Sequence, residues 1–191
     1  MTDKGEARVW WPWLAALLVA AGAATLLHQQ GRAWVCACGR VRVWTGEAWG
    51  ADTSQHLFDP YSLTHVLHGV LFCGLLALML PRLATRWRFA LAVAAEALWE
   101  VVENSETVIN RYREATAALG YHGDTVVNSL GDIAACAAGF WLAARLGWRR
   151  ALVLFALVEL VLLVWIRDSL LLEVLMLVHP VEAIKTWQAG H

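Results

Sequence analysis

The sequence has little charge, little proline and no run of basic residues. Only 16% of its 191 residues are Asp, Glu, Lys or Arg, the formal net charge is -1, and 59% of the residues are hydrophobic. A chain of this length with so few charges is too apolar for an ordinary soluble domain. Without a basic block it also has nothing that would attract nucleic acid. We therefore predict an integral membrane protein with no nucleic-acid partner.

The sequence also lacks a disulfide framework. Of its four cysteines, Cys73 and Cys136 fall inside apolar runs, and only Cys36 and Cys38 lie in a polar stretch. Two thiols separated by one residue can hold a soft metal or pair with a partner. A bond between the two themselves would close a small, strained ring. The sequence leaves open whether the pair binds a metal or has no role.

Long apolar runs dominate what remains and predict an all-α fold. Five runs approach the length of about 17–25 residues that a membrane-crossing helix needs, and they cover residues 9–27, 62–80, 87–110, 125–144 and 151–166. A sixth stretch, residues 169–178, is too short to span and stops before Pro180, which predicts an interfacial or re-entrant helix. The predicted fold is a polytopic bundle of five transmembrane helices forming one domain, residues 1–191.

The loops predict the orientation of this bundle. The short connections at residues 81–88 and 145–150 each carry three Arg and no acid, which is typical of cytoplasmic loops. The N-terminus is then cytoplasmic, and residues 28–61, residues 111–123 and the C-terminus face outward. The loop at 28–61 also carries three Arg, but its length and its acids weaken that conflict. Tryptophan at the ends of the apolar runs fits aromatic belts at the two membrane surfaces.

Ionisable residues lie inside the predicted spans, at similar depths. Counting about 1.5 Å per residue from the cytoplasmic Arg brings four helices to one level in the outer third of the membrane. The residues at this level are His65, His68, Glu100, Glu103, Asn128, Asp132, Arg167 and Asp168. Within a helix they share a face, as His65 and His68 do at i, i+3. Each charge costs at least about 2.5–3.5 kcal/mol at mid-bilayer, so the groups must be paired, hydrated, protonated or metal-bound.

Two further features accompany this stripe. Glu96 and Glu159 count as deeper than the others and are candidates for protonated partners. Gly131, Ala135 and Gly139 recur at four-residue spacing, which predicts close helix packing. An internal polar network that only holds the helices together is the alternative to a site. Because interhelical polar contacts in bilayers average only about 0.6 kcal/mol, we favour an outward-facing pocket.

Several segments closely resemble an uncharacterised family of small bacterial inner-membrane proteins, known only as a domain of unknown function. The resemblance covers about residues 58–188. Its motifs are Ser62-Leu-Thr-His-Val-Leu-His-Gly69, Trp99-Glu-Val-Val-Glu-Asn104, Asp124 to Asn128, Ile166-Arg-Asp168 and His179-Pro-Val-Glu-Ala-Ile-Lys185. It implies a multi-pass protein of the bacterial inner membrane.

A more distant similarity is to VanZ-like proteins, whose pattern is a helix-borne His, an acid with a polar residue three positions on, an Arg, and Asp-x-x-x-Asn-x-x-Gly. The matching positions are His65 or His68, Glu100 with Glu103, Arg111 or Arg113, and Asp124 with Asn128 and Gly131. Glu103 departs from the pattern, because an amide is expected there. The similarity implies a role in the cell envelope and no particular reaction.

We interpret the pocket as the site of a membrane-embedded enzyme that acts on a lipid or lipid-linked envelope substrate. His65, His68, Glu103 and Asp132 are the expected ligands of a divalent metal such as Zn²⁺, which would activate a water. Glu103 or Asp132 would be the general base and Arg167 would bind a phosphate or oxyanion. Glu100, Asn128 and Asp124 complete the expected catalytic set.

Other functions use the same residues. A non-catalytic accessory protein could hold a lipid headgroup, a peptide or a cation in the pocket. A proton-coupled transporter is less favoured, because the sequence shows no inverted repeat and no interrupted helix. No HEXXH motif is present, so no motif dictates a reaction. Membrane lipids are the expected partners, and the sequence predicts neither a protein partner nor an oligomeric state.

Overall fold

The computed structural model describes residues 3–118 and 120–190, with only the backbone for residues 3–8. The described part of the chain is all helical, with no strand and one isolated β-bridge between Trp44 and Phe58. The eight helices in this part are α1 (Asp3–Gln29), α2 (Ser62–Met79), α3 (Thr85–Glu103), α4 (Glu106–Ala115), α5 (Val126–Leu146), α6 (Trp148–Trp165), α7 (Leu170–Val178) and α8 (Glu182–Ala189). The prediction of an all-α chain is confirmed.

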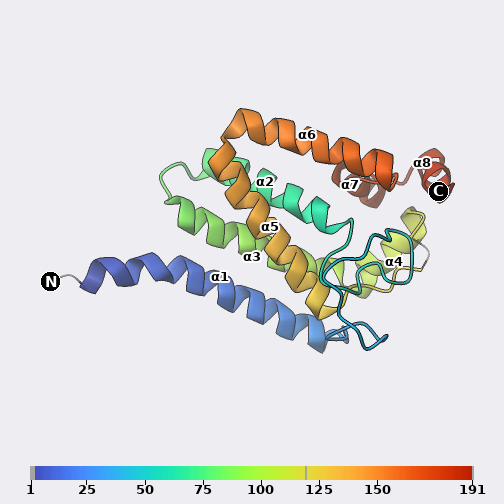
Figure 1. Ribbon diagram of the computed structural model, residues 1–191, viewed down its shortest axis with the longest axis horizontal. Helices are drawn as coiled ribbons and strands as arrows, with labels where there is room; N and C mark the ends of the chain where they lie inside the picture. The colour runs from blue at the N-terminus through green and yellow to red at the C-terminus, as the bar shows by residue number, and fades with distance from the viewer. Residues whose placement is uncertain (1–2, 119, 191) are drawn as a thin grey trace.

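Five long helices run back and forth between two ends of the molecule (Figure 1). The short connections from α2 to α3 and from α5 to α6 lie together at one end, and the loop at 30–61 lies at the other with α4, α7 and α8. The first end carries the arginines of the two short connections, from Arg82 to Arg88 and from Arg145 to Arg150. The bundle therefore has one end with the two short, arginine-bearing connections and another end covered by the long loop and short helices.

Three of these helices are long and apolar enough to cross a membrane, by length and composition: Val9–Gln29, Ser62–Met79 and Val126–Leu146. The other two long helices carry more charge. Helix α3 contains Glu96, Glu100 and two arginines, and α6 begins with Arg149 and Arg150 and contains Glu159. The structure thus supports a membrane protein without establishing the predicted number of five spans.

The predicted helix at 87–110 is interrupted, which corrects its boundary. Helix α3 ends at Glu103, and α4 begins at Glu106. Ser105 lies between them in an extended conformation, and its hydroxyl accepts a hydrogen bond from the Val108 amide at 3.4 Å. A serine in this position satisfies an otherwise free amide of a new helix. The chain thus turns over the site instead of continuing along the bundle.

Helices α2 and α5 pack more extensively than any other described pair. A Cβ atom on Gly69 would collide with the Cys136 carbonyl oxygen, and one on Gly139 would collide with the Val66 carbonyl oxygen. Only glycine allows the two backbones to approach this closely. The predicted close packing at Gly139 is confirmed, and α2 and α5 hold their polar residues side by side.

The loop at 30–61 is bonded to the start of α5. The amides of Val126 and Val127 donate to the carbonyl oxygens of Ala33 (2.8 Å) and Trp34 (3.1 Å). The Thr125 amide donates to the Ser54 carbonyl oxygen at 3.0 Å. The first amides of a helix have no partner within that helix, so these bonds fix the loop over the end of the bundle.

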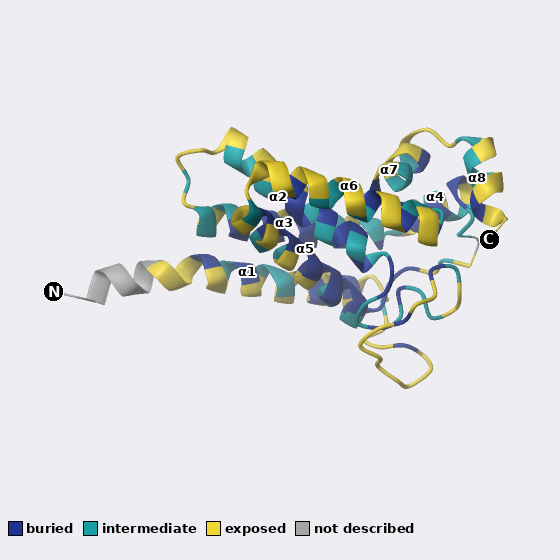
Figure 2. Ribbon diagram, turned by 45° about the horizontal axis from the view of Figure 1, so that its top comes forward, coloured by how far each residue is buried: buried dark blue, intermediate teal, exposed yellow. Residues whose placement is uncertain are grey.

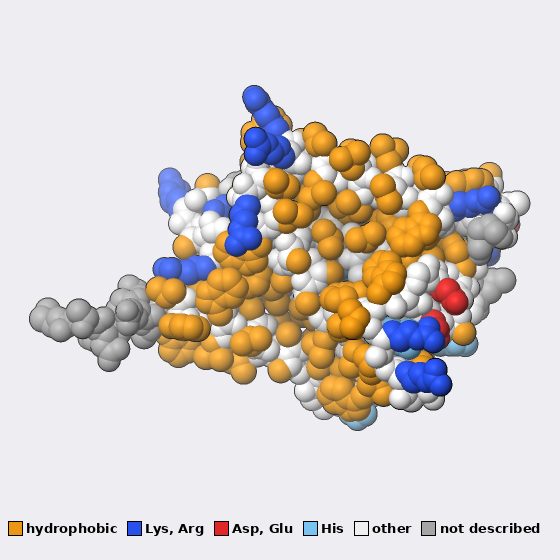
Figure 3. All heavy atoms as spheres, viewed as in Figure 1, with side chains coloured by type: hydrophobic (Ala, Val, Ile, Leu, Met, Phe, Trp, Pro, Cys, Tyr) orange, Lys and Arg blue, Asp and Glu red, His pale blue; other side chains and the backbone are white. Residues whose placement is uncertain are grey.

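Large apolar side chains cover much of the outside of the bundle. Leu78 is 80% exposed and Val164 is 82% exposed. Figure 2 shows exposed residues along the outer side of α6, and Figure 3 shows hydrophobic side chains over most of the face it presents. A soluble monomer rarely exposes apolar patches of this extent, which again indicates a membrane protein.

Candidate functional site

A histidine pair and one glutamate form the centre of the candidate site. Glu96 of α3 is fully buried and accepts from two rings of α2: His65 Nδ1 lies 2.5 Å from Oε1, and His68 Nδ1 lies 3.0 Å from Oε2. The two rings pack edge to face at 5.1 Å. Because Glu96 engages Nδ1 of both rings, it fixes their orientation and leaves both Nε2 atoms for other partners.

Glu96 is therefore not a separate, deeper residue, and that prediction is wrong. It was placed by counting from arginines that lie at different distances from the helix ends. Counted from the ends themselves, His68 lies eleven residues before Met79, and Glu96 lies eleven residues after Thr85. The short connection joins these ends at one level, so the two side chains meet.

Two further carboxylates of α3 lie beside His65. Glu100 is fully buried, and its Oε1 lies 3.3 Å from His65 Nδ1, yet neither of its oxygens has a hydrogen-bond partner among the described residues. Glu103 lies one turn further on, and its Oε2 also lacks such a partner within the described chain. Buried carboxylate oxygens are normally satisfied, so these atoms lie ready for a cation or a ligand.

Asp132 of α5 lies on the other side of His65. Its Oδ2 is 3.9 Å from His65 Nε2, and its Oδ1 accepts a hydrogen bond from the Ser62 hydroxyl at 2.5 Å. Ser62 in turn accepts a bond from the Asp59 amide at 3.1 Å. The start of α2 is thus anchored to α5 through Asp132, and Ser62 is a site residue that we did not predict.

Asp124 is held by a second buried network. The Asn104 amide donates to its Oδ2 at 2.8 Å, the Tyr121 hydroxyl donates to its Oδ1 at 3.0 Å, and the Asp124 backbone amide donates to Asn104 Oδ1 at 2.7 Å. Asn104 is only 1% exposed. It was missed as a site residue, although it directly follows the predicted acids in Trp99-Glu-Val-Val-Glu-Asn104.

The two remaining predicted site residues are Asn128 and Arg167. Asn128 is buried in the first turn of α5, and its side-chain amide has no hydrogen-bond partner in the described part of the chain. Arg167 follows α6, where its guanidinium donates to the Trp187 carbonyl oxygen at 3.1 Å and lies 5.9 Å from the centre of the Trp187 ring. The structure therefore brings Arg167 to α8 and gives it no contact with the histidine–carboxylate cluster.

A cavity of about 630 Å³ opens beside the cluster; it is the more polar of two neighbouring cavities and is called the polar cavity. Five carboxylates line it, and its described lining includes no Lys or Arg. The carboxylates belong to Glu103, Asp124, Asp132, Asp168 and Glu173. Residues 48–51 and 53–55 of the loop form part of its wall, as do residues 116–118 and 120–122. Such a cavity suits a cation or a ligand bound through one.

A second cavity of about 420 Å³ lies against the first. Helices α2, α3 and α7 supply its apolar wall, which includes Phe72, Leu98, Trp99, Val102, Leu170, Val174 and Leu177. Thr64, His65, Glu103, Tyr112 and Glu173 line both cavities. His65 and Glu103 therefore stand where a polar space and an apolar space meet.

Asp168 and Asp59, which both lie outside the helices, have raised pKa values. Burial raises the pKa of Asp168 to about 7, against hydrogen bonds from the Ser169 amide and the Tyr61 hydroxyl that lower it. Burial also raises the pKa of Asp59, although the amides of Ser54 and Tyr61 donate to it. Desolvation disfavours the charged form of a carboxyl group, so Asp168 titrates near neutral pH.

The cluster offers two overlapping ligand sets rather than the single predicted one. His65, His68 and Glu96 form one set, and His65, Glu100 and Glu103 form the other, each with ligand atoms within 4.8 Å of one another. His65 belongs to both. Of the predicted ligands, Asp132 belongs to neither set, although it lies close to His65 Nε2.

Comparison with known proteins gives a family without a described activity. A family model described as a protein of unknown function, DUF2585, matches residues 27–190. UPF0314 proteins of Paracoccus denitrificans and Sinorhizobium fredii are each 45% identical to this chain, over 94% and 99% of it and 93% and 96% of their own lengths. The UPF0314 protein of Sphingopyxis alaskensis is 45% identical over 93% of the chain and 95% of its own length. No solved structure matches.

Proposed function

The chain belongs to the DUF2585 family, and from the geometry of its site we propose that it is a membrane-embedded, metal-dependent enzyme acting on a lipid or lipid-linked substrate. The observation that carries this proposal is the position of His65 and Glu103. Both residues belong to one potential ligand set, and both line the polar cavity and the apolar cavity at once.

A divalent cation fits the cluster better than a network of hydrogen bonds does. Glu100 is fully buried with neither oxygen hydrogen-bonded within the described chain, and its ligand atoms lie within 4.8 Å of those of His65 and Glu103. One imidazole and two carboxylates are the ligand types of catalytic Zn²⁺ sites, which keep a position open for water. Glu96, bonded to His65 Nδ1, would then orient that ligand from behind.

The paired cavities support an amphipathic substrate. A headgroup would occupy the polar cavity, and an acyl or isoprenoid chain would lie along the apolar wall formed by α2, α3 and α7. Because no Lys or Arg belongs to the described lining of the polar cavity, a phosphate would have to be held by the cation. Arg167, bonded to Trp187, is not required for this step.

The proposed chemistry is the attack of an activated water on the substrate. The bound cation would lower the pKa of a water, and that water would give its proton to a carboxylate acting as general base. Glu103 would give one oxygen to the cation, and its other oxygen is the better candidate for the base, because Glu103 borders both cavities, whereas Asp132 already accepts from Ser62. Asp132, whose Oδ2 lies 3.9 Å from His65 Nε2, would lie beside the cation that this nitrogen binds.

The membrane arrangement that we propose has five spans and a cytoplasmic N-terminus. Helix α3 packs against all three apolar helices, and α6 packs against two of them, α2 and α5 (Figure 1). Glu96 and Glu100 of α3 are fully buried within the bundle. The arginines of the two short connections gather at one end, which favours that end as cytoplasmic in the inner membrane. The cavities would then open near the outer surface.

The similarity to VanZ-like proteins belongs to the same proposal. His65 and Asp124 match positions of that pattern, and both line the polar cavity, as does Glu103, which departs from the pattern. Asn104, bonded to Asp124, supplies an amide next to the position where Glu103 departs from the pattern. This agreement supports a role in the cell envelope.

Metal analysis tests the proposal. Purified wild-type protein should contain about one divalent ion per chain, and His65→Ala should lose it while keeping its helical content. His122→Ala is the matched control, because His122 lines the same cavity and bonds to Arg113 instead of the cluster. A folded wild type that remains metal-free after incubation with Zn²⁺ would refute the metalloenzyme.

Cation binding without chemistry is the second candidate, favoured by the five carboxylates of the polar cavity. It predicts that Glu103→Gln weakens cation binding and that no lipid changes. The enzyme predicts that lipids incubated with the protein change in composition. Turnover therefore separates the two functions, even though both depend on the same side chains.

A further inference from the structure

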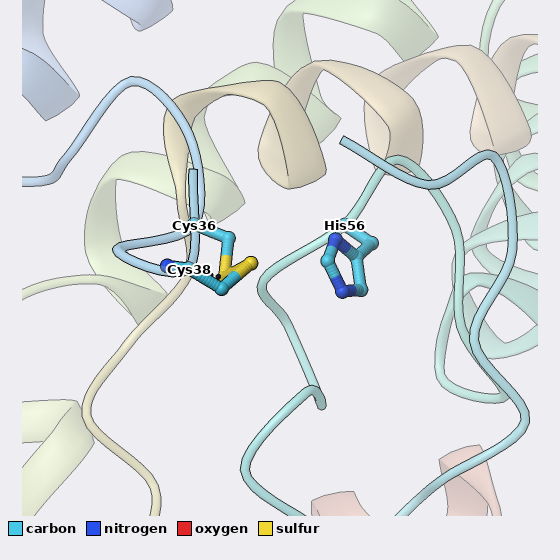
Figure 4. Close-up of side chains that lie close together, drawn as sticks. All are labelled: Cys36, Cys38 and His56. Atoms are coloured by element: carbon cyan, nitrogen blue, oxygen red, sulfur yellow. Dashed lines mark hydrogen bonds between the residues drawn. A yellow bond between two sulfur atoms is a disulfide. The ribbon is translucent and has the colours of Figure 1, made fainter. Parts of the chain in front are cut away.

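The loop at 30–61 carries a second group of potential ligands, separate from the cluster around His65. Cys36, Cys38 and His56 present two sulfur atoms and an imidazole nitrogen within 4.8 Å of one another. Figure 4 shows the two cysteine side chains together, with the His56 ring across from them. The two sulfurs form a disulfide in this structure.

His56 is an unusual buried histidine. Its ring is fully buried, but Nδ1 only accepts a long bond of 3.4 Å from the Arg42 amide, and Nε2 makes no hydrogen bond within the described residues. The nearest acidic oxygen, Asp52 Oδ1, is 3.7 Å from Nε2. A buried imidazole with so little hydrogen bonding requires an explanation, and its position facing two sulfur atoms supplies one.

We propose that Cys36, Cys38 and His56 form a redox-controlled site for a soft metal ion, Cu⁺ or Zn²⁺, in the reduced protein. Two thiolates and one imidazole are the ligands that select these ions. Cys36 is buried and Cys38 is exposed, so one face of the site is open to solvent for entry of the ion. The disulfide is the metal-free state of the same residues.

The conversion of the disulfide into the metal-bound dithiolate conserves electrons and protons. A dithiol reductant supplies two electrons and two protons to the sulfur–sulfur bond and becomes a disulfide itself. The two thiols release those two protons when the ion binds, because only thiolates are ligands. Oxidation of the pair reverses the step and releases the ion.

Metal binding would also join two parts of the loop. It would link Cys36 to His56. The next residue, Leu57, donates its amide to the Arg42 carbonyl oxygen, and the preceding residue is Gln55. Gln55 lines the polar cavity and donates to the Gly123 carbonyl oxygen at 3.1 Å. A bound ion would therefore restrain the segment that forms part of the wall of this cavity.

Alkylation of the two cysteines tests the proposal in the full-length, detergent-solubilised protein. Cys73 and Cys136 are replaced by serine, so that only Cys36 and Cys38 can react, and the protein is reduced with a phosphine. Added Zn²⁺, or in a parallel sample Cu⁺, should slow iodoacetamide labelling by at least about tenfold, because a thiolate bound to the metal is no longer free to act as the nucleophile. Mass spectrometry of the peptide carrying both cysteines gives the rate, and the two samples distinguish the ions.

Variants of the third ligand complete the test. His56→Asn should lose most of the protection, whereas His28→Asn, at the end of α1 and bonded to the Arg32 carbonyl oxygen, should keep it. Circular dichroism establishes that each variant keeps its helical content. Labelling that is equally fast with and without either ion, or protection that survives His56→Asn, would overturn the proposal. Because the readout is confined to the two cysteines, it is independent of metal bound at His65.

Discussion

At the scale of single residues, Glu96 organises the site. One carboxylate engages Nδ1 of His65 and of His68, and it lies on the helix that also carries Glu100 and Glu103. Outer carboxylates of this kind fix the ring orientation of histidine ligands. In the proposed site, Glu96 therefore positions the histidines and does not contact substrate.

Two substitutions test whether Glu96 positions the histidines or is only one of several buried glutamates. Glu96→Gln should weaken Zn²⁺ binding about 10–100-fold, because it removes the charged partner behind His65. Glu159→Gln, which changes another buried glutamate, on α6, should leave the affinity unchanged. Competition with a chromophoric chelator measures both constants. Equal affinities in the two variants would contradict a positioning role for Glu96.

The raised pKa of Asp168 predicts that the stability of the folded protein depends on pH. Its pKa is about 7 in the folded protein and 3.8 in its ordinary state, so the folded protein binds the proton more tightly. Between these values the folded state holds more protons than the unfolded state, and stability falls as pH rises from about 4 to about 7. Asp168→Asn should remove this contribution. Thermal midpoints in detergent across this range measure it, and an unchanged slope in the variant would refute the assignment.

Sequence reasoning predicted most of the cluster but not its connections. His65, His68, Glu100, Glu103 and Asp132 share helix faces, and a period of 3.6 residues makes that visible. Ser62 and Asn104 were missed because their importance comes from partners on other helices, Asp132 and Asp124. Pairing across elements depends on the register between helices, which no local pattern contains.

At the scale of elements, the contact between α2 and α5 sets the distance from His65 to Asp132. Gly69 and Gly139 allow the two backbones to meet. The four-residue spacing of small residues on α5 predicted this contact. The end of α3 was not predicted, because no Gly or Pro follows Glu103 before the end of α4 and only the cap at Ser105 marks the break.

Two glycines of α2 give a matched test of this packing. Gly69→Val should destabilise the bundle by about 1–3 kcal/mol, because the new side chain meets the backbone of α5 at Cys136. Gly74→Val adds the same atoms to the same helix where nothing lies within 4 Å, and it should have little effect. Thermal unfolding in detergent compares the two. Similar losses in both variants would show that α2 and α5 do not meet at Gly69.

At the scale of the whole molecule, charge and apolar surface divide the protein along the bundle. The two short connections, which carry arginines and no acid, lie at one end, and the polar cavity lies at the other end, under the loop at 30–61 (Figure 1). Three helices qualify as spans by composition, and α3 does not, because it carries acids and arginines. The five-span arrangement that we propose holds α3 in the membrane because Glu96 and Glu100 are buried inside the bundle.

Reporter fusions test this orientation. A reporter that is active only outside the cytoplasm should be inactive after Leu83, in the arginine-rich connection, and active after Ala117, beyond α4. A reporter that works only in the cytoplasm should give the opposite pattern at both positions. Activity of the first reporter after Leu83 would invert the topology and place the cavity on the cytoplasmic side.

Turnover of lipid tests the central claim most directly. Inner-membrane lipid extract incubated with Zn²⁺-loaded wild-type protein should lose one lipid species and gain its cleaved or transferred product, as resolved by mass spectrometry. Glu103→Gln, which lacks the proposed base, should reduce the rate by about 10²–10⁴-fold. Chelation of the metal should reduce it as well. A lipid profile that is the same with wild-type protein, with Glu103→Gln and with no protein would contradict an enzyme at this site.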